Sequence, residues 1–426
     1  MSTVLGIGLP DEWSTVRLKH VTTLLNRGSA PTYVDQGQVR AISQAANQAA
    51  GLDWTRTRYH EFSGDPRKLK GYLRPSDVLI NSTGTGTLGR VGYFTQSPDG
   101  TPCMADSHVT VVRVDPRHLD SRYAYYWLGC RPFQEYVYAA LVVGATNQIE
   151  LNHDRLGDAP IPLPPLGEQR RIADFLDAET GSMDAVLRAR SRMYELLDER
   201  IEHQVLEIIG RSRLGDHTAG NPVLPMRWLL EKRVRPTLDS PEVITAFRDG
   251  QVTARSLRRA EGYTNPASSG PQGQAVRVGD VVVHGLDGFA GAIGTSEAEG
   301  NCSPVYHVLT PKGEGDALYY GRMLRILALQ KYLTGFSFST RERAFDFRNW
   351  DMFGRIPIPV ASISEQRCIG DQIRMVRPLR DKFDKFRKLI AERRRFIIAA
   401  AVSGHFDVSA ASGRNVTAGT ETGPGS

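Results

Sequence analysis

DAPIPLPPLGEQRRIADFL, residues 158–176, returns as GRIPIPVASISEQRCIGDQI at residues 354–373. In both stretches a Pro-Ile-Pro triplet precedes Glu-Gln-Arg by the same number of residues, and an isoleucine follows two residues later. Proline suits the first turn of a helix, and an acidic side chain suits the positive end of its dipole. Each stretch therefore predicts the end of a globular domain and the start of a long helix.

A second pair of matching stretches lies upstream, in the same order. LRPSDVLINSTGTGTLGRVG covers residues 73–92, and VRVGDVVVHGLDGFAGAIG covers residues 276–294. Asn81 matches His284, and three similarly spaced glycines follow in both copies. Two matches in one order indicate duplication of a unit of roughly 200 residues, which is too long for a solenoid repeat.

Each copy reads as a mixed α/β domain. The β-branched runs 78–80 and 281–283 are bounded by Gly, Asp and Pro, which predicts strands. Residues 123–138 and 319–332 have helical spacing, and we expect their aromatic side chains to be core rather than a base-stacking surface. The predicted fold class is therefore mixed α/β, with two duplicated domains and two long helices.

The two long segments carry heptad seams, which need an apolar partner. We therefore expect the two helices to pack on each other, each about 60 Å long at 1.5 Å per residue. Two unrelated bundle helices are the alternative. Pro378 should kink the second helix or delay its regular part. The residues that recur every seven positions are Leu187, Tyr194, Ile201 and Ile208 in the first segment, and Ile369, Val376, Phe383, Ile390 and Ile397 in the second.

Composition sets further bounds. A chain of 426 residues is longer than the ~250–300 at which single cores usually split, so we expect two or more domains. A net charge of +6 permits nucleic-acid binding without requiring it. The four cysteines form no C-x-x-C pair, which argues against a zinc ribbon. We expect a cytoplasmic protein with no membrane segment, and a disordered Gly-rich tail from residue 409.

Enzyme motifs are incomplete. Gly84 and Gly89 have P-loop spacing, but Arg90 follows where a P-loop needs lysine. An Asn-Pro-Pro-aromatic or Asp-Pro-Pro-aromatic motif, which a base-amino methyltransferase would need, does not occur. His108 and His307 occupy similar places after a cysteine, but further ligands are missing, so we expect structural roles. The sequence predicts no catalytic residue, no metal and no cofactor.

The first domain opens with Pro-x-x-Trp, carries a Gly-Asp-Val-like strand and ends in an Ile-Pro-Leu-Pro-Pro-Leu-x-Glu-Gln junction at 161–169 before a long helix. This unit, which occurs twice, resembles the specificity subunit of type I restriction-modification systems. The resemblance covers roughly residues 10–408, although Ala-Ser-Ile at 361–363 replaces Pro-Pro-Leu at the second junction. It implies two target-recognition domains, related by a pseudo-twofold axis and separated by an antiparallel coiled-coil-like helix pair. The expected division is a first domain at 1–165, a first helix at 166–212, a second domain at 213–362, a second helix at 363–405 and a disordered tail at 406–426.

The resemblance also implies a function. Such a subunit is not an enzyme: each domain reads one half of a split double-stranded DNA target, and helix length sets the gap between the halves. Its implied partners are two modification (methyltransferase) subunits and, for restriction, motor-nuclease subunits. A spacer of about 60 Å covers about 17–18 base pairs at ~3.4 Å each. Two alternatives stay open, a scaffold-only degenerate specificity subunit and a nuclease with an unrecognised site.

Candidate DNA contacts come from the residues alone, because target domains differ between members of this family. Arg, Asn and Gln suit base edges, whereas Lys and Arg hold phosphates. The first-domain candidates are Arg56, Arg58, Lys68, Lys70, Arg90, Asn147 and Gln148, and the second-domain candidates are Arg255, Arg258, Arg259, His284, Arg341 and Arg343.

Overall fold

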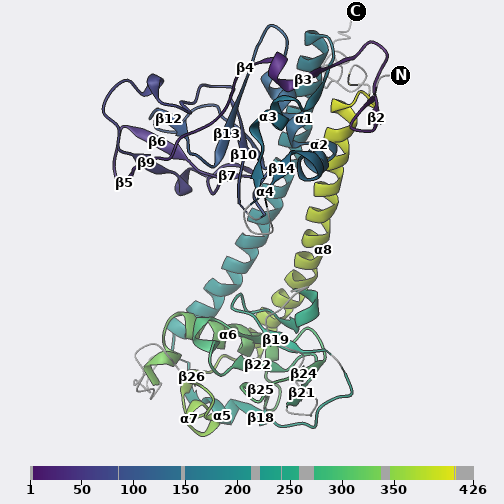
Figure 1. The fold of residues 1–426 in the computed structure, drawn as a ribbon. Helices are drawn as coiled ribbons and strands as arrows, with labels where there is room; N and C mark the ends of the chain where they lie inside the picture. Colours follow the sequence, from purple (N-terminus) through teal and green to yellow (C-terminus); the bar gives the residue numbers. More distant parts are fainter. Residues whose placement is uncertain are drawn as a thin grey trace, which may run out of the picture. The chain divides into compact units, whose positions relative to one another are not determined.

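The computed structural model describes residues 3–84, 86–144, 149–212, 221–240, 242–258, 273–336, 346–406 and 408. The chain forms two compact units, which we call unit 1 (Met1–Leu187 with Phe386–Ser426) and unit 2 (Arg188–Lys385). Two long helices, α4 (Leu166–Gly210) and α8 (Ile363–Val402), each contribute one segment to both units (Figure 1). No helix in the described part of the chain is long and apolar enough to cross a membrane.

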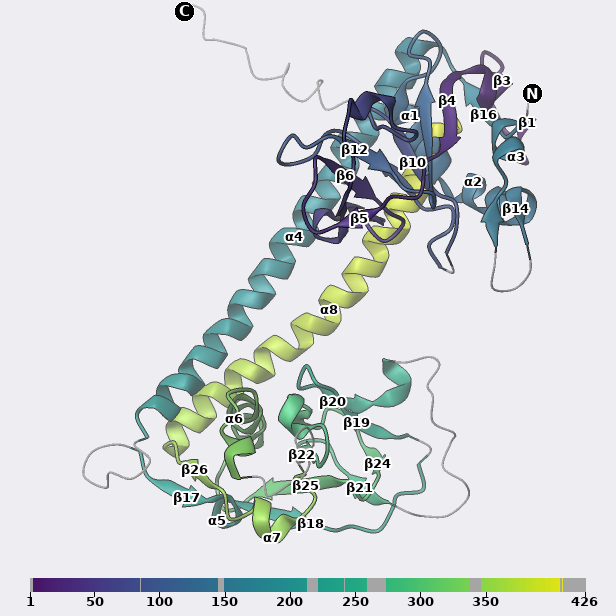
Figure 2. The same ribbon diagram turned by 60° about the vertical axis from the view of Figure 1, so that its left-hand side comes forward.

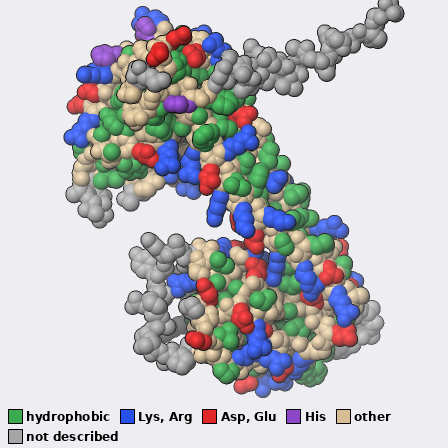
Figure 3. All heavy atoms as spheres, turned by 90° about the vertical axis from the view of Figure 1, so that its right-hand side faces the viewer, with side chains coloured by type: hydrophobic (Ala, Val, Ile, Leu, Met, Phe, Trp, Pro, Cys, Tyr) green, Lys and Arg blue, Asp and Glu red, His purple; other side chains and the backbone are tan. Residues whose placement is uncertain are grey.

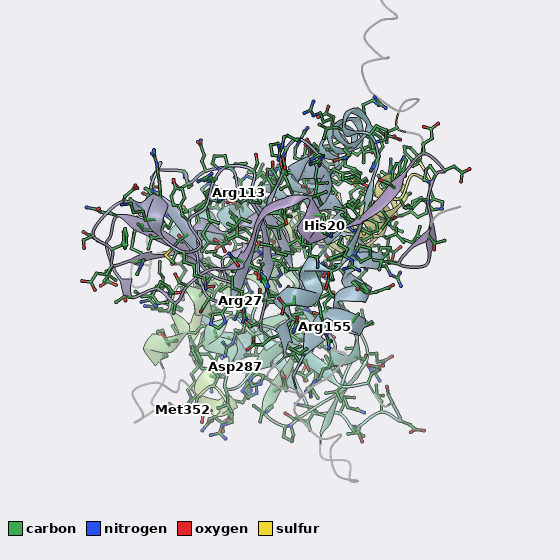
Figure 4. All side chains as sticks on the ribbon, turned by 45° about the horizontal axis from the view of Figure 1, so that its top comes forward. His20, Arg27, Arg113, Arg155, Asp287 and Met352 are labelled. Carbon is green, nitrogen blue, oxygen red and sulfur yellow. The ribbon has the colours of Figure 1, made fainter. Side chains whose placement is uncertain are left out.

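Unit 1 is built on an antiparallel four-stranded sheet with the order β11-β10-β13-β4. Every residue of its central strand β10 is buried, as a run of β-branched and apolar residues predicts. Next to the start of β10, Arg113 of β13 (labelled in Figure 4) donates to the buried carboxylate of Asp77 at 2.7 Å. The strands are β4 (Thr22–Arg27), β10 (Val78–Asn81), β11 (Val91–Tyr93) and β13 (Val109–Val114).

A second sheet of unit 1 has the order β12-β6-β9-β5, with one parallel pair, β12 and β6. Its strands are β5 (Tyr33–Val34), β6 (Val39–Ile42), β9 (Arg58–His60) and β12 (Cys103–Ala105). The short strands β7 (Asn47–Gln48) and β8 (Gly51–Leu52) form a hairpin beside β11, and β1 (Thr3–Val4) pairs with β2 (Ile7–Gly8). Two further strand pairs are β3 (Ser14–Arg17) with β16 (Pro160–Leu163), and β14 (Val142–Val143) with β15 (Glu150–Leu151), which is followed by α3 (His153–Gly157).

Unit 2 repeats the main sheet of unit 1. Its order β18-β25-β22-β23 corresponds strand by strand to β4-β13-β10-β11, which confirms the duplication predicted from the sequence. These strands are β18 (Leu230–Arg233), β22 (Val281–His284), β23 (Ile293–Thr295) and β25 (Tyr306–Pro311). The remaining pairs are β17 (Val223–Pro225) with β26 (Pro357–Pro359), β19 (Ile244–Ala246) with β20 (Val252–Ala254), and β21 (Gln274–Val276) with β24 (Gly300–Cys302).

Strand register corrects one correspondence drawn from the sequence. Thr110 lies opposite Ile80, and His307 lies opposite Val283. His307 is therefore the counterpart of Thr110 and not of His108. The spacing from the matching cysteines predicted the wrong pairing because the loops that follow these cysteines differ in length in the two copies.

The aromatic segments are helices that cover the main sheets. In unit 1, Tyr123 and Trp127 of α1 (Ser121–Gly129) are fully buried, and in unit 2 Tyr319 of α6 (Ala317–Leu329) is too. The prediction that these rings belong to the core is confirmed. Pro132, in the first turn of α2 (Arg131–Tyr136), separates that helix from α1 because proline is favoured there. A π-helical turn, Val137–Leu141, follows.

The duplicated Glu-Gln pair has a structural role. Gln169 is fully buried; its Oε1 accepts the Asp120 N–H at 2.8 Å, and its Nε2 donates to the carbonyls of Pro164 and His118. Gln366 repeats the arrangement, accepting from the Asp316 N–H and donating to a backbone carbonyl. Asp120 and Asp316 are the N-caps of α1 and α6. The motif therefore ties the start of each long helix to the start of a domain helix.

The two long helices run antiparallel within each unit. In unit 1 the start of α4 lies beside the end of α8 (Figure 2). There Asp184 accepts from Arg394 at 2.7 Å, and the rings of Phe175 and Phe406 stack. In unit 2 the end of α4 meets the start of α8, near the ion pair of Arg211 with Glu365 at 2.7 Å. Helix α8 is continuous through Pro378, so its regular part is not delayed.

The end of the chain is anchored on unit 1. The Tyr123 hydroxyl donates to the Val402 carbonyl at 3.1 Å, and Gly404 lies against Pro10 and Trp13. Val408 is buried in the core of unit 1, so residues 406 and 408, assigned to the tail from the sequence, pack instead. Residues 409–426 lie outside the described part.

Replacing Gln169 with leucine should destabilise unit 1 by about 2–4 kcal/mol, because a buried N–H and two carbonyls lose their partner. Gln366→Leu should act similarly on unit 2. Chemical denaturation followed by tryptophan fluorescence would measure both, with Gln372→Leu on the outer part of α8 as the control. Equal stabilities of Gln169→Leu and the control would show that the glutamine is not an anchor.

Candidate nucleic-acid interface

Equivalent edges of the two main sheets carry polar residues. Strand β10 ends at Asn81 opposite Val109, where β13 begins, and β22 ends at His284 opposite Tyr306, where β25 begins. Loops leave both strand pairs at this edge. Such loops, held by a rigid sheet, commonly carry binding residues.

In unit 2 this edge borders an open hollow of about 1050 Å³. The candidates Arg255, Arg258 and His284 all line it, although His284 is distant from the other two in sequence. The prediction therefore selected residues that the fold brings together. The other lining residues are 243–249, Leu286, Asp287, Ala292, Ser303, Val305 and Tyr306.

His284 is positioned as a neutral hydrogen-bond donor. Its Nδ1 accepts the backbone N–H groups of Leu286 at 3.1 Å and Asp287 at 2.9 Å, and its ring packs edge-on against Tyr306. Burial lowers the pKa of His284, so the ring is neutral at pH 7. With Nδ1 accepting, the proton is on Nε2, which can donate to an acceptor on a base edge.

Two arginines flank the histidine. The Arg258 guanidinium lies over the Phe247 ring at 4.3 Å and pairs with Asp249 at 2.8 Å. Arg248, which the sequence analysis did not select, pairs with Asp287 at 3.1 Å (Figure 4). Carboxylates hold both guanidinium groups in place, which reduces the entropy lost when either group binds a base or a phosphate.

The corresponding edge of unit 1 carries a different polar group. The Thr83 hydroxyl donates to Gln44 Oε1 at 3.0 Å and so accepts from His108 Nδ1 at 2.7 Å. Asn81, the counterpart of His284, is buried and donates to the Gln44 carbonyl. In unit 1, the strand ends that correspond to those beside the hollow of unit 2 therefore carry Gln44, Thr83 and His108. The strand alignment of the two copies could have indicated them.

The first-domain candidates lie on separate elements. Arg58 is exposed on β9 over the Tyr33 ring at 4.2 Å, and Arg56 ends a short 3-10 helix and pairs with Asp53. Lys68 and Lys70 are exposed around another such turn. Arg90 is half-buried, and its guanidinium donates to the Asn47 carbonyl and the Gln48 side chain, so it holds the β7–β8 hairpin.

Five candidates lie outside the residues that the structure describes. They are Asn147, Gln148, Arg259, Arg341 and Arg343.

Cysteine and histidine side chains in the described ranges do not gather into a metal site: no group of three or more His, Cys, Asp or Glu residues there could hold an ion. Burial raises the pKa of Cys103 and Cys302 to about 12, so these thiols stay protonated. Burial lowers the pKa of His307 to about 4, and its Nε2 donates to the Phe347 carbonyl at 2.6 Å. His307 is therefore a neutral structural residue, as expected.

Residues 10–183 match the family model described as type I restriction modification DNA specificity domain. Over this region the chain is therefore similar to the DNA specificity domains of that family. In unit 2 the main sheet, its helix and the buried glutamine of the matched region recur. Comparison with curated proteins gives no match.

Three solved structures resemble the chain. One, from a study of complex assembly and conformational transition of the type I R-M system, is 17% identical with a TM-score of 0.60, and the match covers 94% of this chain and 100% of that one. The type I restriction-modification S subunit from M. genitalium is 14% identical with a TM-score of 0.50, covering 96% and 98%. The HsdS subunit from Thermoanaerobacter tengcongensis is 15% identical, covering 93% and 98%, with a TM-score of 0.44. The first two show that the chain shares their fold.

Proposed function

We propose that the chain is the specificity subunit of a type I restriction-modification complex, reading a bipartite double-stranded DNA target. One observation carries the proposal: a specificity domain of known family is followed by a second domain with the same sheet order. Two similar readers in one chain suit two half-sites. The proposed parts are readers at 1–165 and 213–362, and spacer helices at 166–212 and 363–405.

Exposed apolar side chains on the long helices support the proposal that partner subunits bind there. In unit 2, Met193 of α4 and Met375 of α8 are 52% and 66% exposed, and in unit 1 Leu389 and Phe396 of α8 are 62% and 73% exposed. Figure 3 shows hydrophobic side chains at the surface among Lys and Arg. Large apolar side chains exposed close together commonly mark protein contacts. We assign these helical surfaces to two modification subunits, and the chain itself acts without catalysis.

Mapping methylated bases genome-wide, with and without this gene, tests the function. A split motif that is methylated only when the gene is present is the expected result. A complex that assembles but selects no sequence would favour the scaffold-only alternative. Magnesium-dependent cleavage by the purified chain would favour the nuclease.

Arg255, Arg258 and His284 are the proposed base or phosphate contacts of the second reader. Arg258→Ala should weaken binding of the assembled complex to its target by about 1–3 kcal/mol, with relaxed choice in one half-site only. Arg233→Ala is the matched control, because Arg233 pairs with Glu231 on β18, away from the hollow. Competition binding with DNA altered in either half would measure this. Loss of selectivity in the half-site assigned to the first reader would contradict the assignment of these residues to the second reader.

A further inference from the structure

Unit 2 contains another hollow, of about 320 Å³, at the low end of ligand-pocket sizes. It lies where α6 and β23 meet the unit 2 segments of α4 and α8. Four arginines line it: Arg322 and Arg325 from α6, and Arg377 and Arg380 from α8. Asp249 lines both this hollow and the larger one, so the two are neighbours.

Three of the four guanidinium groups share two carboxylates. Arg322 forms a two-pronged pair with Asp198 of α4. Arg380 donates to Glu297 at 2.6 Å, and Arg377 approaches the same carboxylate at 3.4 Å. Asp249 is already paired with a fifth arginine outside the set. The hollow therefore carries more positive than negative charge.

Arg325 is the cation with the weakest compensation. One nitrogen donates to the Arg248 carbonyl at 3.4 Å, and its buried Nε has no hydrogen-bond partner among the residues that the structure describes. Its side chain lies against Gly250, where an added Cβ would come within 2.5 Å of the Arg325 Cδ. Burial lowers the pKa of Arg325 and of Arg377. Both cationic forms would therefore gain from a bound anion.

We propose that this hollow binds a phosphate group. A planar guanidinium offers two parallel N–H donors to phosphate oxygens, and clustered arginines are a common way to bind phosphate. The phosphate could come from the DNA backbone or from a free phosphate compound; the chemistry of recognition is the same. The site does not rest on the proposed function, because inorganic phosphate alone tests it.

Thermal unfolding of the full chain in inorganic phosphate, against chloride at equal ionic strength, is the first measurement. Phosphate should raise the Tm of the wild type by about 2–4 °C. Arg325→Gln should abolish this rise, and in chloride it should unfold no earlier than the wild type, because it removes a poorly compensated charge. Arg192→Gln, which removes an exposed α4 arginine paired with Glu195 and Glu199, should keep the rise.

Two outcomes would overturn the proposal: an unchanged wild-type Tm in phosphate, or an Arg325→Gln variant whose Tm still rises in phosphate as that of the wild type does. Should the variant fail to fold, equilibrium dialysis of the wild type decides, with one labelled phosphate expected per chain and none contradicting the site.

DNA titration separates the two sources. If the phosphate belongs to DNA, Arg325→Gln should reduce the slope of log K against log salt by about 1 for every sequence tested. If the slope is unchanged while the phosphate-dependent rise is lost, the ligand is a free phosphate compound. A wild type that binds no DNA would refute the proposed function and leave the phosphate site to the thermal measurement.

Discussion

Exchanging residues 226–356 for the corresponding segment of another family member should change one half of the methylated sequence completely and leave the other half unchanged. The ends of this segment lie just inside the paired strands β17 and β26, which the recipient keeps. The unit 2 hollow, with Arg255, Arg258 and His284, lies wholly within it.

The exchange leaves unit 1 intact because no residue of that unit is replaced. It also keeps Gln366, whose partner is the backbone N–H of Asp316, a group that any residue except proline can supply at the same position of the incoming segment. Sequencing of methylated sites from cells that carry the chimera is the measurement. The unmodified chain, expressed alongside, provides the reference motif. If both halves of the motif change together, the model of two independent readers is wrong.

Lengthening both long helices by four residues should widen the unspecified gap of the DNA target by one or two base pairs. We place the insertions after Leu187 in α4 and after Lys385 in α8, where each helix passes from one unit to the other. Four residues add about 6 Å, close to two base pairs at ~3.4 Å. Ion pairs inside each unit, such as Asp184 with Arg394 in unit 1, keep their register.

The control is an insertion of two residues at the same positions. It turns each helix by about 200° and should therefore misdirect the apolar seams and reduce assembly. Methylation-site sequencing again gives the readout, this time of the gap length. An active four-residue variant with the original gap would show that something other than helix length sets the spacing.

Local sequence was sufficient to predict the duplication and the long helices. The repeat of Pro-Ile-Pro and Glu-Gln-Arg marked both junctions, and the structure begins its long helices at Leu166 and Ile363. Aromatic residues at helical spacing predicted a core helix in each unit, as Tyr123 and Tyr319 show. These features are periodic or repeated along the chain, so a single sequence reveals them.

Tertiary structure alone decided which distant residues meet. The sequence suggested that Gln169 starts a helix, but its bonds to Asp120 and His118 depend on the fold of the preceding domain. Strand register, and not the distance from a cysteine, paired His307 with Thr110. Such contacts join residues far apart in sequence and leave no local pattern. The same reason explains why no single sequence motif predicts the hollow that four arginines from two separate helices line.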